Sequence, residues 1–358
     1  MHLRNGNNQK YEHAFQVGLM GIDLASEGPI NKKRGSSYLI NYRFSTTSLA
    51  SGNDINLKYQ DLAFKLNFPT RKAGSFSMGD RSSGSNKLDK LAGGLTHKYV
   101  INENTYIRSS LSATYSKDHS LVNLQTDDGT IVQVGDIQNS RWNFVFNSYL
   151  NKKFSSRHTN RTGITITELK YDLDSKGSGE STVFSAYSSS VINLSNNLTT
   201  SLGVTGQYFT LNKNWSIEPR VALKWKINPA HSLAVAYGLH SHRERLDYYF
   251  VEQVINGKKE SNRYLDFSKA HHFGFTYDWN INQSLHLKIE PYYQYLFHIP
   301  VEKNSSFSII NYEEFYLDRI LTSTGTAKNY GIDITLEQYM KNGFYYMITG
   351  SLFKSKYR

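Results

Sequence analysis

Large apolar residues alternate with polar or small residues along many segments of the chain, with a period of two. Between residues 38 and 44, Tyr, Ile, Tyr and Phe occupy the even positions, whereas Leu, Asn and Arg occupy the odd positions. Successive side chains of a β-strand point to opposite faces, so this period predicts strands with one apolar and one polar face. The same alternation predicts strands over 220–227, 232–240, 273–279, 285–290 and 330–337, and weaker patterns predict strands over 63–68, 76–78 and 163–171.

Eight short polar turns separate these segments, at 31–34, 70–72, 102–104, 151–153, 195–197, 228–230, 282–283 and 341–343. From residue 32 to residue 342 there are seven intervals, so the mean spacing is about 44 residues, whereas a soluble β-sandwich turns every ~8–12 residues. A short turn, two strands and a longer loop at the other end are the layout of an outer-membrane β-barrel. We therefore expect an all-β, antiparallel transmembrane β-barrel of about 14–16 strands with meander topology.

The long polar segments 116–140, 243–269 and 300–328 lie opposite these turns, and we expect them to form loops on the ligand-facing side. Pro219 and Pro291 fall within the strand patterns, where proline cannot donate a ladder hydrogen bond, so strand ends or bulges are expected there.

The two faces of the predicted strands differ in chemistry, which sets an orientation. Apolar residues are expected on the lipid side: Ile40, Leu223, Val235, Phe275, Leu287 and Ile334. Charged residues are expected on the lumen side: Arg43, Lys224, Lys226, Lys288 and Glu337. A soluble sandwich would instead bury its apolar face against a second sheet. The wide turn spacing favours the barrel.

Composition narrows the class further. The chain has 358 residues, no cysteine and a net charge of +11, and no segment has the ~18 consecutive apolar residues of a membrane helix. The cations are spread along the chain instead of forming one basic patch, so no nucleic-acid partner is expected. No break in composition divides the chain, which predicts one barrel domain over residues 1–358. The first eight residues lack the apolar core of a signal peptide, and the last residues follow a strand pattern directly, so we expect a fragment of a larger protein.

Few residues suggest chemistry. His240 and His242 would share a strand face, but no third metal ligand can be placed near them, so we interpret them as hydrogen-bonding histidines. His271 and His272 would point to opposite faces. Asp127 and Asp128 lack the spacing of a calcium loop, and the acidic pairs Asp172/Asp174 and Glu313/Glu314 are interpreted as solvated charge. No nucleophile elbow or phosphate-binding loop is present, so we expect no enzyme activity, no cofactor and no metal site.

Several segments together resemble the barrel of TonB-dependent receptors, the large outer-membrane importers of Gram-negative bacteria. They are 28–30 with 37–43, the run 59–70, Glu218-Pro219-Arg220 leading into 221–225, and 326–333 followed by 341–346. The resemblance covers nearly the whole chain and matches the middle of the family's barrel.

The resemblance implies a 22-strand barrel in the intact protein, closed by an internal plug domain and coupled through a TonB box to the energised inner membrane. The chain shows no recognisable plug, TonB box or closing strands. The resemblance implies an outer-membrane location, with the lipid bilayer, the protein's own plug, the TonB complex and a small extracellular ligand as partners. An iron chelate, cobalamin or a glycan is the expected ligand class, and no ligand-binding residue can be named from the sequence.

Other functions stay open at this point. A plugless outer-membrane porin or adhesin would share the same alternation. A membrane-embedded hydrolase would need a Ser/His constellation that the sequence does not reveal, and a soluble sandwich lectin would need closer turns.

Overall fold

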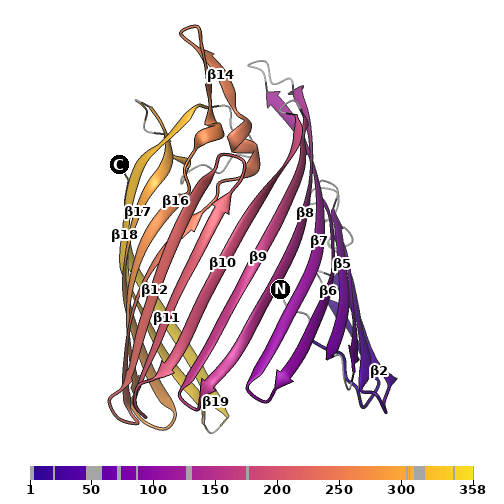
Figure 1. Ribbon diagram of the computed structural model, residues 1–358, viewed down its shortest axis with the longest axis vertical. Coiled ribbons are helices and arrows are strands. Elements are labelled where there is room, and N and C mark those ends of the chain that lie inside the picture. The colour runs from indigo at the N-terminus through magenta and orange to yellow at the C-terminus, as the bar shows by residue number, and fades with distance from the viewer. Residues whose placement is uncertain are drawn as a thin grey trace. The chain divides into compact units, whose positions relative to one another are not determined.

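The computed structural model spans residues 1–358 and describes all of them except 1–3, 19–20, 46–58, 71–73, 86–87, 126–130, 175–176, 304, 306, 310–318, 342 and 358. The chain divides into two compact units. Unit 1 contains Met1–Leu150 and Ile164–Phe184, and unit 2 contains Asn151–Gly163 and Ser185–Arg358. Both consist almost entirely of strands (Figure 1).

Unit 1 is built on an antiparallel meander in which each strand from β1 to β7 pairs with the next one along the chain. Its strands are β1 (Glu12–Gly18), β2 (Gly21–Asn31), β3 (Ser36–Phe44), β4 (Tyr59–Pro69), β5 (Ser75–Ser85), β6 (Leu88–Asn102) and β7 (Thr105–Gln125). It also holds most of β8 (Ile131–Ser155) and parts of β9 (His158–Leu173) and β10 (Ser178–Asn193).

Unit 2 continues the same arrangement, again with antiparallel pairing in chain order. Its strands are β11 (Leu198–Phe209), β12 (Asn214–Lys226), β13 (His231–His242), β16 (Ser268–Asn280), β17 (Leu285–Glu302), β18 (Leu321–Lys341) and β19 (Phe344–Tyr357). The antiparallel all-β meander predicted from the alternation is confirmed.

The predicted turns at 31–34, 102–104, 195–197, 228–230 and 282–283 lie where consecutive strands meet, whereas residues 71–72 and 342 of two further predicted turns lie outside the described residues. The turn predicted at 151–153 is wrong, because these residues belong to β8 and the chain reverses at Ser156 and Arg157. There the Arg157 backbone N–H donates to Ser155 Oγ at 3.2 Å, a local bond typical of turns. In the described part of the chain the main sheet has seventeen strands, more than the expected 14–16, because β1 precedes the first predicted turn.

The polar segment 116–140 was expected to be a loop, and this expectation is wrong. β7 continues to Gln125 and β8 begins at Ile131. Strand pairing is a property of the backbone, so polar composition does not prevent it. The segment 300–328 is also shorter as a connection than expected, since β17 ends at Glu302 and β18 begins at Leu321. The segment 243–269 is a long connection as far as residue 267, and β16 begins at Ser268.

Both prolines lie inside strands, not at the strand ends or register-shifting bulges that were expected. Pro219 pairs with Val204 of β11, while the ladder between β12 and β13 stops one residue away, at Arg220. Pro291 pairs with Ile332 of β18, while the ladder between β16 and β17 is interrupted beside it. Each proline therefore sits where one neighbouring strand needs no N–H donor from it.

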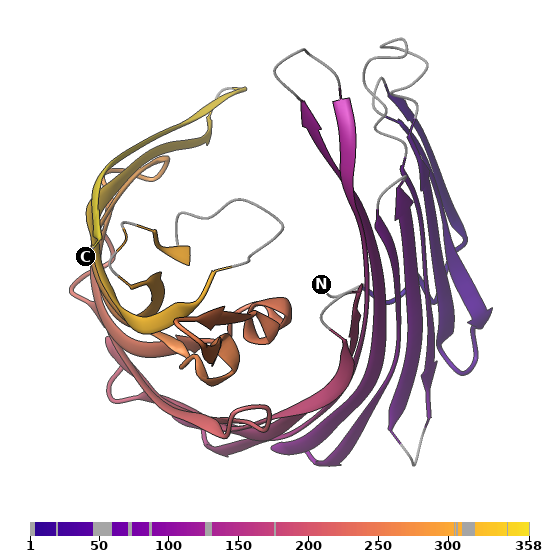
Figure 2. The same cartoon turned by 90° about the horizontal axis from the view of Figure 1, so that it is seen from above.

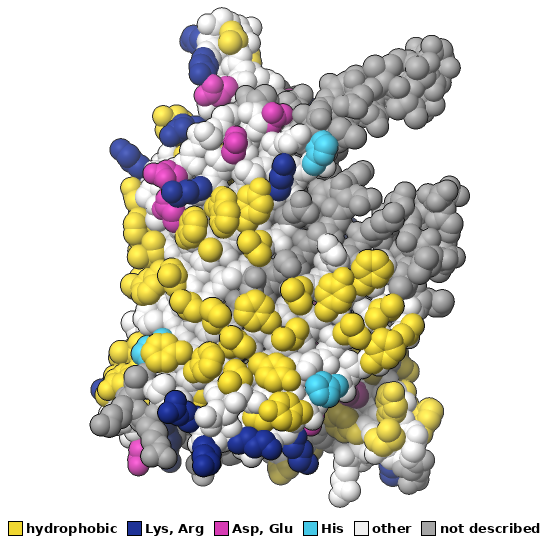
Figure 3. All heavy atoms as spheres, turned by 90° about the vertical axis from the view of Figure 1, so that its right-hand side faces the viewer, with side chains coloured by type: hydrophobic (Ala, Val, Ile, Leu, Met, Phe, Trp, Pro, Cys, Tyr) yellow, Lys and Arg dark blue, Asp and Glu magenta, His cyan; other side chains and the backbone are white. Residues whose placement is uncertain are grey.

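The registers place the predicted apolar residues on one face of each unit. Leu223, Val235 and Phe275 are cross-strand neighbours in unit 2, and Lys224 lies on the opposite face with Ala234. The apolar face is exposed: Val235 is 47% accessible in unit 2 and Ile40 is 42% accessible in unit 1. Figure 3 views the side on which Figure 1 shows β5 and β6, and there hydrophobic side chains form a broad band with Lys and Arg gathered below it. Such a face suits contact with lipid.

No helix in the described part of the chain is long and apolar enough to cross a membrane. The only regular helical turns there are η3 (Leu246–Phe250) and η4 (Asn262–Tyr264), which belong to the connection between β13 and β16. Within unit 2, this connection lies on the concave side of the curved strands (Figure 2).

Candidate functional site

A hollow of about 710 Å³ opens in unit 2 over strands β10 to β17. Its floor is made of small residues, which leave the backbone uncovered: Ser201, Gly203, Ala222, Ala236, Gly238 and Gly274. Longer polar side chains surround this floor: Gln207, Glu218, Arg220, His240, His272 and Gln294. Apolar side chains, among them Val221, Tyr237 and Phe273, also line the hollow, so it combines an apolar surface with a few hydrogen-bonding groups, as small-molecule sites do.

Glu218 organises one side of the hollow. Its side chain is only 2% exposed, and its carboxylate accepts hydrogen bonds from Gln207 Nε2 at 2.6 Å and Ser216 Oγ at 3.1 Å. Ser241 Oγ also donates to it, and Arg220 Nη2 donates to its second oxygen at 2.8 Å. A buried carboxylate requires such donors. Because they come from β11, β12 and β13, Glu218 joins these strands where the backbone ladder between β12 and β13 ends.

Two histidines also line the hollow. The rings of His240 on β13 and His272 on β16 lie with their centroids 4.7 Å apart and their planes at 54°. A Cβ atom at Gly238 would lie 2.7 Å from His240 Nε2, so the glycine leaves the space that this ring uses. The pair presents ring nitrogens beside Arg220, an arrangement suited to hydrogen bonding with acceptor groups.

The connection from β13 to β16, here called the loop module (residues 243–267), shares a hydrophobic core with Phe209 at the end of β11. Phe209, Tyr249 and Phe267 are 0%, 1% and 1% exposed. The ring of Phe209 lies 5.5 Å from that of Tyr249 in an edge-on contact and 6.4 Å from that of Phe267. The Arg243 guanidinium lies 5.6 Å above the Phe209 ring. Burial raises the pKa of the Tyr249 phenol well above its usual range, so this hydroxyl stays neutral.

Asn262 fastens the loop module to the beginning of β18. Its side chain, in a residue 1% exposed, donates to the Arg319 carbonyl at 2.8 Å and accepts from the Leu321 N–H at 2.7 Å. From this base the hairpin of β14 (Glu252–Ile255) and β15 (Lys258–Ser261) projects outwards (Figure 1). The loop module is thus a folded platform at the loop end of unit 2, next to the hollow.

The histidines singled out from the sequence divide between different environments. His240 lines the hollow, where its ring neighbour is His272, whereas His242 is exposed. His271 and His272 do separate, since His271 Nδ1 meets the Tyr237 hydroxyl at 3.0 Å in the aromatic cluster with Phe297. Period two was the signal that placed His240 and His272 on strands, but only the strand register reveals that they meet.

The acidic residues considered in the sequence form no binding site in the described part of the chain. Asp172 and Asp174 are exposed at the end of β9, whereas Asp127, Asp128 and the pair at 313–314 lie outside the described residues. Within the described part of the chain, no three or more His, Asp or Glu side chains gather as metal ligands. Glu218 and Arg220 were noticed only as flanks of Pro219, and nothing in the sequence marked Gln207 or Ser241 as their partners.

No protein-family model matches the chain, and no curated protein matches it in sequence. Solved structures do match in fold. The ferric enterobactin receptor PfeA of Pseudomonas aeruginosa, solved as a mutant, superimposes with a TM-score of 0.70 at 12% identity, over 96% of this chain and 61% of the receptor. The siderophore receptor PirA of the same organism gives 0.71 at 10% identity, over 96% and 64%. The outer membrane transporter YddB of Escherichia coli gives 0.67 at 12% identity, over 94% and 55%.

These likenesses establish the fold. The chain has the β-barrel fold of outer-membrane receptors and transporters, and the predicted resemblance to TonB-dependent receptors is confirmed at the level of structure. The chain spans about three fifths of the length of the first structures that it matches.

Proposed function

We propose that the chain is the barrel part of an outer-membrane receptor that imports a small, scarce extracellular ligand. The observation that supports this most is the combination of receptor fold and hollow: 96% of the chain superimposes on siderophore receptors, and the hollow has hydrogen-bonding groups at its wall.

An iron chelate is the ligand class that we favour over cobalamin or a glycan. The matched structures are described as a ferric enterobactin receptor, siderophore receptors and an iron transporter. The polar side chains of the hollow form hydrogen bonds and ion pairs, which suits ligand binding. We propose that the intact protein lies in the outer membrane, encloses a plug and takes energy from the TonB complex.

The test compares uptake by cells that carry the intact parent protein with uptake by cells that carry a plug-deleted version. Two quantities are measured: growth under iron limitation and uptake of radioactive ferric siderophores. Each is measured with and without an uncoupler that dissipates the proton gradient across the inner membrane. We expect energy-dependent uptake only with the intact protein. Uptake that is unaffected by plug deletion and by the uncoupler would contradict the importer and favour a plugless porin.

A pair of variants connects the hollow to that activity. Arg220→Gln should raise the ligand concentration needed for half-maximal uptake, because Arg220 is 46% exposed at the wall of the hollow. Lys226→Gln, at the turn end of the same strand, is the matched control and should leave uptake unchanged.

A further inference from the structure

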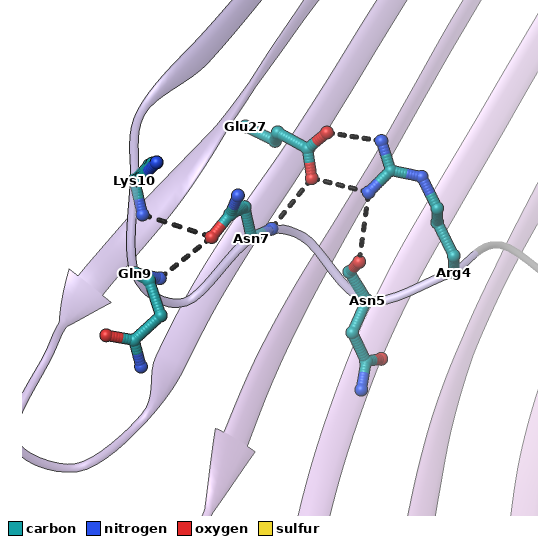
Figure 4. A network of polar contacts seen from close by, with 6 residues as sticks. All are labelled: Arg4, Asn5, Asn7, Gln9, Lys10 and Glu27. Atoms are coloured by element: carbon teal, nitrogen blue, oxygen red, sulfur yellow. Dashed lines mark hydrogen bonds and ion pairs between the residues drawn. The ribbon is translucent and has the colours of Figure 1, made fainter.

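Residues 4–10 of unit 1, here called the strap, lie across β2 and β3 without forming a strand. The Glu27 carboxylate on β2 accepts from Arg4 Nη1 at 2.5 Å, from Arg4 Nη2, and from the Asn7 backbone N–H at 2.7 Å (Figure 4). Asn7 Oδ1 in turn accepts from the N–H groups of Gln9 and Lys10, at 2.8 and 3.0 Å. The strap is therefore folded around one carboxylate.

The strap fits closely against the backbone beneath it. A Cβ atom at Gly6 would lie 1.9 Å from the Tyr38 carbonyl oxygen, a distance that no real side chain permits. Glu27 is only 8% exposed, and within the described part of the chain every hydrogen bond to its carboxylate comes from the strap. The carboxylate thus depends on the strap for all the donors that compensate its burial.

A second carboxylate, that of Glu12, lies opposite Glu27, so loss of the strap would also affect the pairing of β1 with β2. In the ladder between β1 and β2, Glu12 is the direct cross-strand partner of Glu27. Directly opposed residues point to the same face, and like charges in such a pair oppose strand pairing. Every residue of β1 is exposed, so little other packing holds this strand. The charge of Glu12 also acts on Arg4, in addition to the direct bonds of Arg4 to Glu27.

We propose that Arg4 is a charge clamp: by pairing with Glu27 and offsetting its repulsion of the facing Glu12, it couples docking of the strap to pairing of β1 with β2. When the strap leaves, two carboxylates face each other across the ladder without a counter-ion. Residues 4–18 then loosen as one unit, while β2 and the following strands stay paired. The inference concerns unit 1 alone and is independent of the proposed transport function.

The experiment is amide hydrogen exchange, followed by mass spectrometry on the 358-residue chain in detergent micelles, with peptides that cover residues 4–11 and 12–18. Arg4→Met should speed exchange of the strap by at least about tenfold, as expected for loss of a charged hydrogen-bond pair. It should also speed exchange of β1, by up to about fivefold for an opposed like-charge pair.

Removing one carboxylate at a time separates the two effects. Glu12→Gln in the Arg4→Met background should return β1 exchange to the wild-type rate but leave the strap fast. Glu27→Gln alone should free the strap and leave β1 protected, because the like-charge pair is gone. Arg4→Lys should retain β1 protection but hold the strap less well, since an ammonium group lacks the forked geometry.

Glu103→Gln, an exposed carboxylate in the turn between β6 and β7, is the matched control and should change neither peptide. Exchange in β6 and β7 reports whether each variant has folded. A slow strap in Arg4→Met would overturn the clamp. A fast strap with unchanged β1 exchange would overturn the coupling and leave only a local ion pair.

Discussion

The strap and the loop module both lie on strands without belonging to the main sheet. Different interactions hold them in place. The strap in unit 1 is held by one carboxylate and one guanidinium, and Arg4 itself is 67% exposed. The loop module in unit 2 is held by buried rings and by the amide of Asn262. Burial of aromatic area resists salt, whereas a partly exposed ion pair is weakened by it. We therefore expect the strap to detach from its strands more readily than the loop module does.

The largest expected effect is on the core of the loop module. Phe209→Ala should destabilise the loop module by about 3–5 kcal/mol, because it removes a fully buried ring that contacts Tyr249 and Phe267. Trypsin cleavage at Lys258 and Lys259 and exchange of residues 244–267 are the measurements. Tyr264→Ala, which truncates a ring 78% exposed, is the control. Equal protection in both variants would refute an aromatic core that holds the loop.

A slightly smaller effect is expected on the sheet that carries the loop module. Val235→Arg places a charge on the apolar face near mid-membrane and should cost about 2–4 kcal/mol in lipid, whereas Ala236→Ser on the opposite face should cost little. Refolding titrations into lipid vesicles compare the two. If both substitutions had the same effect, the assignment of the lipid-facing side would be wrong. Cleavage within the loop module should stay unchanged in the folded Val235→Arg fraction.

Removal of the amide at the base of the loop module should cost less than removal of its core. Asn262→Ala leaves the Arg319 carbonyl and the Leu321 N–H without their side-chain partner, a loss of about 1–3 kcal/mol. Faster exchange of the Leu321 amide, with the aromatic core still protected, is the expected result. Lys258→Ala at the tip of the hairpin is the control, and a collapsed aromatic core in Asn262→Ala would show that the two attachments are not separate.

The smallest effect is the response of the strap to salt. Raising ionic strength from 0.1 to 1 M shortens the screening length from about 10 to about 3 Å, so exchange of residues 4–11 should quicken by a small factor. Exchange of the loop module should not change. A strap that ignores salt would mean that the Gly6 contact, and not the charge of Arg4, holds it in place.

The fold was largely accessible from the sequence, because alternation and turn residues are local signals. Period two located the strands, and polar turns marked their ends, since both reflect which face each side chain occupies. The predicted turn at 151–153 is wrong because Asn and Lys also occur at solvent-accessible positions of strands, and in this chain they belong to β8. The segment 116–140 was misjudged for the same reason: polarity reports exposure and not whether the backbone is paired.

The sites were much less accessible, because they depend on residues brought together by register. Arg4 and Glu27 are 23 positions apart, and Gln207 and Glu218 are 11 apart. No local pattern links such pairs. The sequence shows where the two prolines are. It does not show that the backbone ladder to one neighbouring strand is interrupted beside each of them. His272 was set aside in the sequence, and only the register placed it beside His240.

The core that the loop module shares with the end of β11 also has a consequence for how this protein can change. Because the buried rings and Asn262 lie at its base, residues 252–261 at the hairpin tip contribute little to its stability, and most of the hairpin is exposed. Mutations can accumulate at the tip, or a foreign epitope can be inserted there, without a folding penalty. The hairpin tip is therefore a place where the sequence can change with little effect on the packing at the base of the loop module.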